Sequence, residues 1–409
     1  MTTFKTISDG NIQTTRNVLN QLVDFVAVDV SSSITRKKFQ VFVTGGYGGA
    51  GVTSSLFQTV FDQNYTLQTS NELFDLTVGI FDGSELVSDA LTATDTQGKK
   101  LFSSESLMMR EKISNYGQFS QLLLGDSSKH FTAPFSEAAA DGSDNINVAL
   151  FMPYKRLFSR DGIKRETYAM RFYQSASSAT QIEDGALTAV GQENILLRPN
   201  KYSSGSAIFT DVGSAASIET SPAGGAVGNI VNSANTNESV GLIFYDYGIA
   251  VYDMEKITSA SQLMSGTINC VAGPSTTNNT TVMSGKFIPD FIVSASIDQI
   301  TDHIAETRFG SGSETFLTFQ NNTFINSTLY FCRAMADEFN FSTNPTYTDA
   351  AGNIVVIDNA QQGIQKSFSF VTTVGLYNAN EDLLAVAKMS RPVMKNDEKD
   401  LTFRVRLDF

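Results

Sequence analysis

Tryptophan is absent from this chain, and cysteine, histidine and charged residues are scarce. The 409 residues include two cysteines, two histidines and eight prolines. Charged residues make up 17% of the chain, where about 25% is usual. Two cysteines, Cys270 and Cys332, cannot build a disulfide framework, and they form no CxxC motif. The sequence leaves open whether these two pair with each other.

Long hydrophobic runs are also missing. No apolar stretch approaches the ~20 residues that a membrane-spanning helix needs. The first residues, MTTFKTISDG, lack the charged and then apolar order of a secretion signal. We therefore expect a soluble chain that is made in a reducing cytoplasm.

The net charge of −13 leaves little basic surface for polyanions. Binding to DNA or RNA depends on neutralising phosphates with Lys and Arg, and anionic membranes attract basic segments. The sequence therefore predicts neither a nucleic acid nor a membrane as a partner.

What the chain does contain is phenylalanine and small polar residues. Thirty Phe can fill apolar cores, while Ser, Thr, Asn and Gly favour strands, turns and polar surfaces. We predict a mixed α+β fold that is mostly β, with β-sandwich-like domains and a few helices in the N-terminal third. The expected parts are an N-terminal mixed region at 1–145, a β-rich middle domain at 146–285 and a C-terminal β-sandwich-like domain at 286–409.

Hydrophobic spacing predicts two helices in the first part. Residues 11–25 (NIQTTRNVLNQLVDF) place apolar side chains at near-helical intervals. The clearer helix covers 103–126, and Gly125 is placed to end it. The apolar stripe of this helix consists of Met109, Ile113, Tyr116, Phe119 and Leu123.

Strand patterns dominate the rest of the chain. Four runs with strand character lie at 37–46, 72–83, 146–154 and 163–174. The last two flank a turn signal at Asp161 and Gly162. Residues 240–254 predict a tight hairpin in which Gly248 takes the left-handed conformation. The stretches 202–239 and 272–285 are rich in small polar residues and predict long surface loops.

The end of the chain has a strict alternation. Phe403, Val405, Leu407 and Phe409 alternate with Thr402, Arg404, Arg406 and Asp408. This period of two indicates a strand with one buried face, although chain ends are usually polar and poorly ordered. We expect the strand to insert into a sheet of its own domain or of a neighbouring subunit, which makes Phe409 a candidate interface residue.

The stretch VFVTGGYGGAGVTSS imitates a nucleotide-binding loop. Gly46, Gly48 and Gly51 satisfy GxGxxG after a predicted strand, and the same residues nearly form a phosphate loop. However, Val52 stands where that loop needs its lysine, and no sustained alternation of strand and helix follows. We interpret the stretch as a connector and predict no nucleotide cofactor.

No catalytic or metal-binding motif is recognisable. His130 has no carboxylate or nucleophile at a known spacing, and His303 lies in a predicted helix with Asp302 and Glu306. That cluster could bind a metal, but a solvated helix face explains it more simply. GxSxG, HExxH and EF-hand spacings are absent from the sequence. We therefore predict that the chain is not an enzyme and holds no metal.

One segment is basic within this acidic protein. YKRLFSRDGIKRETYAMRF collects Lys155, Arg156, Arg160, Lys164, Arg165 and Arg171. These residues either form a solvated hairpin tip or dock on an acidic face of a neighbouring subunit, where charge complementarity orients association. We take them as candidate subunit-interface residues.

Several segments together resemble a known family. The sequences that carry the resemblance are SSLFQTVFDQNYTLQTSNELFDLTVG, EKISNYGQFSQLLLGD, RLFSRDGIKRETYAMRF, GLIFYDYGIAVYDM, STLYFCRAMADEFNFSTNPTY and FVTTVGLYNANEDLLAVAKMSRPV. They are spread over most of the chain and resemble virion structural proteins of contractile-tailed, T4-like phages. Tail or baseplate components are the most similar members.

The resemblance implies a non-enzymatic building block of the virion, most similar to a wedge-type subunit of the tail baseplate. Its partners would be other tail or baseplate proteins and further copies of itself, and it would be located in the virion. Two alternatives remain at this stage. One is a structural protein of the neck or the capsid exterior, and the other is a receptor-binding or tail-fibre-attachment protein.

Overall fold

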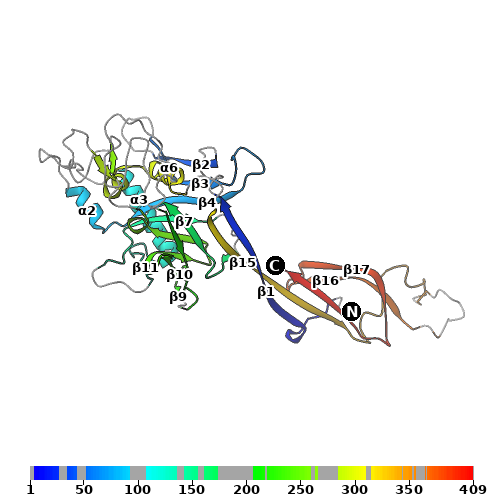
Figure 1. The fold of residues 1–409 in the computed structure, drawn as a ribbon. Helices are drawn as coiled ribbons and strands as arrows, with labels where there is room; N and C mark the ends of the chain where they lie inside the picture. Colours follow the sequence, from blue (N-terminus) through cyan, green and yellow to red (C-terminus); the bar gives the residue numbers. More distant parts are fainter. Residues whose placement is uncertain are drawn as a thin grey trace. The chain divides into compact units, whose positions relative to one another are not determined.

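The computed structural model describes residues 4–26, 35–43, 52–92, 107–135, 142–154, 161–173, 206–216, 219–258, 263–265, 284–309, 315–342, 344–351, 354–355, 364 and 366–408. The chain divides into two compact units, and Figure 1 labels many of their elements. Unit 1 consists of Met1–Val18 and Phe324–Phe409, and unit 2 is the segment Leu19–Thr323. The predicted boundaries near 145 and 285 both lie inside unit 2.

In the described part of both units strands outweigh helices, which confirms the predicted mixed α+β, mostly β fold. The strands of unit 2 are β2 (Arg36–Val43), β3 (Val52–Phe61), β4 (Glu72–Ile80), β5 (Val148–Pro153), β6 (Asp161–Ile163), β7 (Ala169–Tyr173), β8 (Ser206–Thr210), β9 (Glu219–Ser221), β10 (Gly225–Asn232), β11 (Asn235–Phe244), β12 (Ile249–Asp253), β13 (Leu263–Ser265) and β14 (Ser284–Lys286). Those of unit 1 are β16 (Phe368–Tyr377), β17 (Leu383–Asn396) and β18 (Leu401–Asp408), while β1 (Ile12–Val26) and β15 (Thr315–Ala334) have residues in both units.

Helical segments are fewer and mostly short. They are η1 (Asp9–Asn11), α2 (Glu85–Thr92), α3 (Leu107–Leu124), α4 (Met254–Ile257), the π-helical turn η4 (Phe287–Phe291), α5 (Ile292–Ser294) and α6 (Ile297–Thr307). The prediction of helices in the N-terminal third holds for α2 and α3, but it misses α4 to α6. A capping box starts α6, because Ser296 Oγ accepts from the Gln299 N–H and the Gln299 side chain accepts from the Ser296 N–H.

Most strands of unit 2 form one antiparallel sheet. Its order is β1-β15-β7-β8-β10-β11-β12-β5-β4-β3-β2, with β6 also paired to β15 and β9 paired to β10. The predicted hairpin is present as β11 and β12, and Gly248 adopts φ 62° in its turn. This positive φ explains why a glycine occupies position 248, because glycine has no Cβ to clash in the left-handed region.

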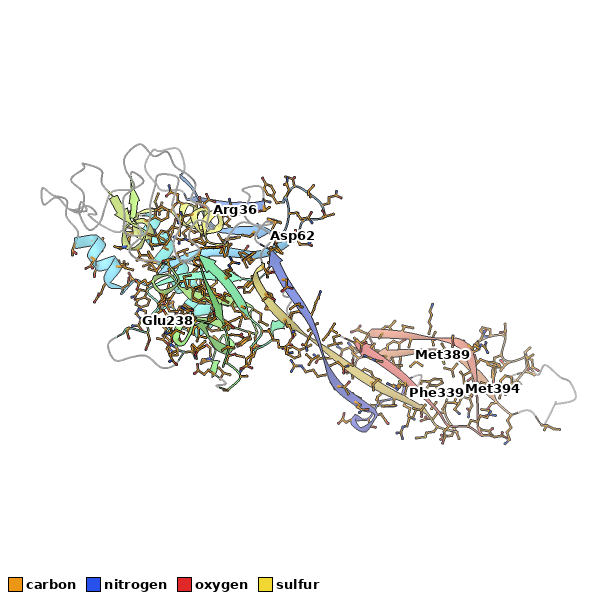
Figure 2. All side chains as sticks on the ribbon, viewed as in Figure 1. Arg36, Asp62, Glu238, Phe339, Met389 and Met394 are labelled. Atoms are coloured by element: carbon orange, nitrogen blue, oxygen red, sulfur yellow. The ribbon has the colours of Figure 1, made fainter. Side chains whose placement is uncertain are left out.

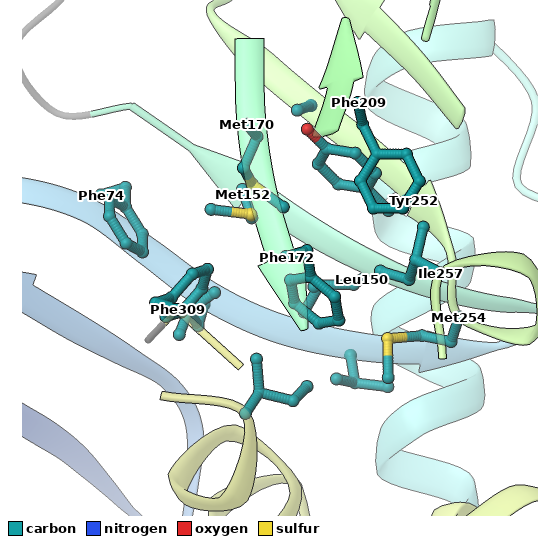
Figure 3. Close-up of a cluster of buried hydrophobic side chains, with 14 of the residues drawn as sticks. Phe74, Leu150, Met152, Met170, Phe172, Phe209, Tyr252, Met254, Ile257 and Phe309 are labelled. Atoms are coloured by element: carbon teal, nitrogen blue, oxygen red, sulfur yellow. The ribbon is translucent and has the colours of Figure 1, made fainter. Parts of the chain in front are cut away.

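The sheet of unit 2 is buried on both faces. In β5, Val148, Leu150 and Met152 belong to the larger apolar cluster, whereas Ala149 and Phe151 belong to a second cluster. Successive side chains of a strand point to opposite faces, so the uninterrupted apolar run of β5 is what a doubly covered strand requires. Figure 3 shows part of the larger cluster.

The predicted helix at 103–126 is confirmed as α3, and it packs against β4. The approach is close at Gly79, where an added Cβ would lie 2.8 Å from Cβ of Tyr116. Any larger residue would therefore push the helix from the sheet. Gly125 follows the helix with φ 80°, as predicted for its C-terminal end.

Lys112 is a charged residue in the core of unit 2. Its side chain is fully buried, and Nζ donates to the carbonyl oxygens of Ile292 (2.6 Å), Val293 (2.9 Å) and Ala295 (2.6 Å). The carbonyl groups at the end of a short helix lack intrahelical partners, so this ammonium group joins α3 to α5. Burial lowers the pKa of Lys112 to about 7, and the neighbouring Glu111 opposes this shift.

The helix predicted at 11–25 is wrong, because these residues form the strand β1. β1 pairs with β15, and in it only Val23 and Phe25 are buried. The apolar residues at helical spacing, such as Leu19 and Leu22, are instead exposed. Pairing with a long neighbouring strand has overridden the local periodicity, which is a weak determinant by itself.

Two loop or turn predictions are also corrected. The stretch 202–239 contains β8, β9, β10 and the first part of β11, although its small polar composition predicts a loop. Asp161 and Gly162 lie in β6 and pair with Thr323 and Asn322 of β15. The second predicted loop, at 272–285, lies almost wholly outside the described residues.

The C-terminal strand is confirmed as β18. It pairs antiparallel with β15, from Asp408 opposite Ser327 to Leu401 opposite Ala334. Val405 is buried and the two arginines of the strand are exposed, as the alternation predicts. The strand therefore belongs to a sheet of its own unit. Phe409 lies outside the described residues.

Replacing Lys112 with methionine should destabilise unit 2. The variant leaves three buried carbonyl groups without their donor, and an unsatisfied buried group costs about 1–3 kcal/mol. We expect the melting temperature to fall clearly in scanning calorimetry. Lys129→Met, at an exposed position beyond α3, is the control and should melt like the wild type. Equal melting temperatures for both variants would show that the three contacts add nothing.

Stability should also depend on pH through Lys112. Its pKa is about 7 in the folded chain against an ordinary value of 10.5, so between these values the unfolded chain binds more protons. The free energy of unfolding therefore rises with pH in this window. Urea unfolding between about pH 7 and pH 10 should show the wild type gaining stability relative to Lys112→Met. A constant difference would contradict the lowered pKa.

Deleting Leu407, Asp408 and Phe409 should destabilise unit 1. The deletion removes part of the pairing with β15 and the hydrogen bond that Ser327 Oγ donates to Asp408 Oδ1 at 2.6 Å. The half-buried Leu407 alone accounts for roughly 1–2 kcal/mol. Thermal unfolding should start earlier, while Arg404→Gln at an exposed site of β18 should change little. Unfolding identical to that of the full chain would refute a structural role for these residues.

Candidate interaction surface

The described part of unit 1 has almost no apolar core. Among its described residues, the buried hydrophobic side chains are Ala334, Leu376 and Val405. Both clusters of buried hydrophobic residues consist of unit 2 residues. Because apolar burial supplies most of the stabilisation of a fold, unit 1 must be held together in another way.

At the same time unit 1 exposes many large hydrophobic side chains. They are Phe4, Ile12, Val18, Met335, Phe339, Phe341, Val355, Ile364, Phe370, Tyr377, Leu383, Leu384, Val386 and Met394. Single exposed apolar residues are normal on a protein surface. A concentration of them in a unit with few buried ones is typical of a surface that another protein covers.

The hairpin of β16 and β17, residues 368–396, carries six of these side chains. It is a two-stranded antiparallel sheet in which Phe370 lies opposite Met394 and Tyr377 lies opposite Leu383. Figure 2 labels Met389 and Met394 on β17. Leu384 is the most exposed of the six, at 66%. A two-stranded sheet by itself is only marginally stable in water.

Polar contacts anchor this hairpin to the rest of unit 1. Lys395 is fully buried, and its Nζ donates to the carbonyl oxygen of Ala336 (3.2 Å), to Asn340 Oδ1 (2.7 Å) and to the carbonyl oxygen of Asn396 (2.7 Å). A buried ammonium group is stabilised only when its donors find acceptors. Three acceptors are present here, so Lys395 ties the turn after β15 to β17.

Tyr347 fixes the first residue of β16. Its hydroxyl accepts from the Phe368 N–H at 3.0 Å and donates to the Phe368 carbonyl oxygen. The ring also contacts Phe341 edge-on, with centroids 5.0 Å apart. Both backbone groups of Phe368 therefore point away from β17, toward the outer edge of β16.

The two strands of the hairpin differ in charge. β16 reads FSFVTTVGLY and has no charged residue and no proline. β17 contains Lys388, Arg391, Pro392 and Lys395. Lysine and proline are common devices that prevent an edge strand from pairing with another chain. β17 has such protection, and β16 does not.

The predicted basic patch is only partly described. Lys155, Arg156 and Arg160 lie outside the described residues. Lys164, Arg165 and Arg171 are each half-buried. Lys164 Nζ donates to Gln320 Oε1 at 3.1 Å, and the Arg165 guanidinium lies over the Tyr245 ring at 5.3 Å. Arg171 Nη2 donates to the Tyr173 hydroxyl at 2.8 Å. These three side chains therefore have contacts inside unit 2, and their docking role stays a prediction.

His303 is not on a solvated helix face. It lies on α6 as predicted, but it is buried and contacts the rings of Phe287 and Phe291. Burial and the nearby Arg308 hold its pKa well below the usual value, so it is neutral. The prediction of a solvated helix face is therefore wrong. The sequence of α6 does not reveal which of its faces packs against the rest of unit 2.

Other titratable groups form internal networks. Asp211 accepts from the backbone N–H groups of Glu166 (2.8 Å) and Tyr168 (3.0 Å) and from the Tyr245 hydroxyl (2.8 Å). Burial raises its pKa. Its oxygens are engaged in holding the connection between β6 and β7 against the turn after β8, which indicates a structural role.

A hollow on unit 2 lies between the end of β4 and α3. It is lined by Phe81, Asp82, Gly83, Ile113, Ser114, Tyr116, Gly117, Gln118, Gln121, Ser127 and Ser128. The Tyr116 hydroxyl is already engaged, since it donates to the Ile146 carbonyl oxygen and accepts from the Phe131 N–H. The lining contains one carboxylate, Asp82, and therefore offers no pair for acid–base chemistry.

Few residues of the remaining predicted small-molecule sites lie in the described part of the chain. The glycines of the nucleotide-loop imitation lie outside the described part, and so does Cys270. Cys332 is half-buried on β15, and burial raises its pKa. Across the described ranges, His, Cys, Asp and Glu form no group of three or more that could hold a metal. No helix in those ranges is long and apolar enough to cross a membrane.

Sequence reasoning missed the hairpin as the principal candidate surface. Its signal was present in the contrast between a charge-free strand and a following strand with three basic residues and a proline. The exposed side of such a strand cannot be recognised from the sequence, because an apolar strand is normally buried.

Comparison with protein-family models, with curated proteins and with solved structures finds no match to this chain.

Proposed function

We propose that this chain is a non-enzymatic structural subunit of a tailed-phage virion. The observation that carries the proposal is the composition of unit 1, which exposes many large apolar side chains and buries three hydrophobic ones among its described residues. Such a surface suits permanent contacts with other proteins. The sequence resemblance to virion proteins of contractile-tailed phages supports the same function.

The physical basis is the interface that stable assemblies require. Permanent interfaces bury roughly 2,000 Å² or more and are more hydrophobic than ordinary surface. The exposed residues of unit 1 come from β16, β17, the segment after β15 and the N-terminal segment. The low content of charged residues, 17% of the chain, also favours burial of its surface against other proteins, because burying a charged group without a partner is unfavourable.

Within the virion we propose the tail baseplate as the location. The basis is the resemblance of segments such as RLFSRDGIKRETYAMRF to tail and baseplate components. The partners are other baseplate proteins, which would cover unit 1, while unit 2 folds around its own apolar core. A subunit of this kind needs neither a cofactor nor a catalytic site.

Charges placed on the hairpin should prevent incorporation into particles. Leu384→Lys with Val386→Lys puts two ammonium groups on exposed apolar positions of β17. We expect the amount of the chain in purified particles to fall by about tenfold or more, which corresponds to ~1.4 kcal/mol of lost binding free energy. Quantitative mass spectrometry of particles from the phage that encodes the chain measures this.

On unit 2, Leu67 in the connection between β3 and β4 is 49% exposed, and Leu122 on α3 is 44% exposed. The matched control, Leu67→Lys with Leu122→Lys, places the same two charges there. It should leave incorporation unchanged, and both variants should keep the wild-type circular dichroism. Electron cryo-microscopy of the particle then locates the chain. Particles that lack the chain altogether would refute the proposed function, and a location outside the tail would refute the baseplate.

A further inference from the structure

We propose that two copies of this chain pair through their β16 strands. The strands would lie antiparallel across a two-fold axis, so that two hairpins form one four-stranded sheet in the order β17-β16-β16-β17. This inference rests on the proposed function, because it names a second copy as the partner of one part of unit 1. It commits to β16 (Phe368–Tyr377) as the contact strand.

The edge of β16 beyond Phe368 is available for such pairing, whereas Phe368 itself is already bonded by the Tyr347 hydroxyl. The backbone N–H and carbonyl groups of Phe368 both bond the Tyr347 hydroxyl, so they point away from β17. Backbone groups alternate in direction along an antiparallel strand, and those of Phe370 therefore point the same way. Among the described residues, β16 pairs with β17 and with no other strand.

The charged residues that protect a strand edge from pairing lie on β17 and not on β16, which indicates the position of each strand in the proposed sheet. Proline in a sheet is restricted to edge strands and bulges because it lacks an N–H donor. β17 contains the charged Lys388 and Arg391, and both are exposed. Pro392 lies where the register with β16 shifts, next to the pair Val371–Val393, and this irregularity accommodates a proline by itself. β16 contains no charged residue. In the four-stranded sheet β17 forms both outer edges and β16 lies at the centre, which matches this distribution.

A second copy fits the edge better than a partner of opposite charge. The chain carries a net charge of −13, so two copies repel each other except where charge is absent. β16 is a ten-residue stretch without charge. Antiparallel self-pairing over Phe370–Tyr377 brings the valines and threonines in the middle of the strand together. Aromatic, β-branched and threonine pairs are favourable across strands, and no like charges meet.

Self-pairing would also complete an otherwise marginal element. A two-stranded hairpin is marginal in water, whereas three or more strands with an apolar face are stable. Leu376 of β16 is buried, while Phe370 and Tyr377 are exposed. Doubling the sheet brings the exposed rings of two copies close to each other. The pairing thus covers apolar surface that the single chain leaves in water.

Charge substitution at Thr372 tests the pairing. Thr372 is exposed, lies in the middle of β16 and has no register partner in β17, so a change there should keep the hairpin intact. Analytical ultracentrifugation should show a dimer for the wild-type full chain. Thr372→Lys and Thr372→Glu should each weaken dimerisation by about tenfold or more, because like charges then meet at the two-fold axis. An equimolar mixture of the two variants should restore the dimer.

A matched control separates this edge from the rest of the hairpin. Ser390→Lys adds the same charge to an exposed position of β17 and should dimerise like the wild type. Hydrogen exchange supplies a second readout. The amides of Phe370–Tyr377 should exchange more slowly at high than at low protein concentration in the wild type, and this difference should vanish in Thr372→Lys.

The outcomes distinguish this inference from the proposed function. A wild-type chain that remains monomeric at all concentrations overturns the pairing, and so do Thr372 variants that dimerise like the wild type. In either case the proposed function stands if the chain is found in particles. A dimer that responds as expected in a chain absent from particles would refute the virion function and retain the strand pairing.

Discussion

The near absence of an apolar core in unit 1 is the constraint on which the rest depends. Hydrophobic burial is the main favourable term in folding, yet the described part of unit 1 buries Ala334, Leu376 and Val405 and little else that is apolar. Strand pairing and buried polar anchors take its place. Lys395 satisfies three acceptors, and Tyr347 bonds both backbone groups of Phe368. Such contacts fix geometry, but each contributes only about 1 kcal/mol net.

Unit 2, in contrast, is stabilised by an apolar core. Its sheet is buried on both faces, and β5 alternates strictly between two apolar clusters. Even there a lysine is essential to the arrangement, since Lys112 holds carbonyl groups of the segment after η4. Both units thus bury one ammonium group with three oxygen acceptors. The difference is that unit 2 adds this contact to a core, whereas unit 1 relies on it.

The sequence predicts those parts of the fold that local chemistry determines. α3 follows from its apolar stripe and Gly125, β5 from its uninterrupted apolar run, and β18 from strict alternation. β1 does not follow, because its pairing with β15 depends on residues 300 positions away. The candidate surface was the least predictable part. Phe370 and Tyr377 of β16 are exposed although residues of these types are normally buried, and only the arrangement of the chain reveals this exposure.

An unprotected strand edge is a hazard, because any extended segment can add to it. A single lysine in β16 would remove that hazard, and exposed positions such as Thr372 could accommodate one. The chain uses this protection one strand away, where Lys388, Arg391 and Pro392 lie on β17. The contrast cannot come from a general shortage of charge, since it occurs between two strands of one hairpin. It is explained if β16 has a partner in the assembled state and β17 remains an edge.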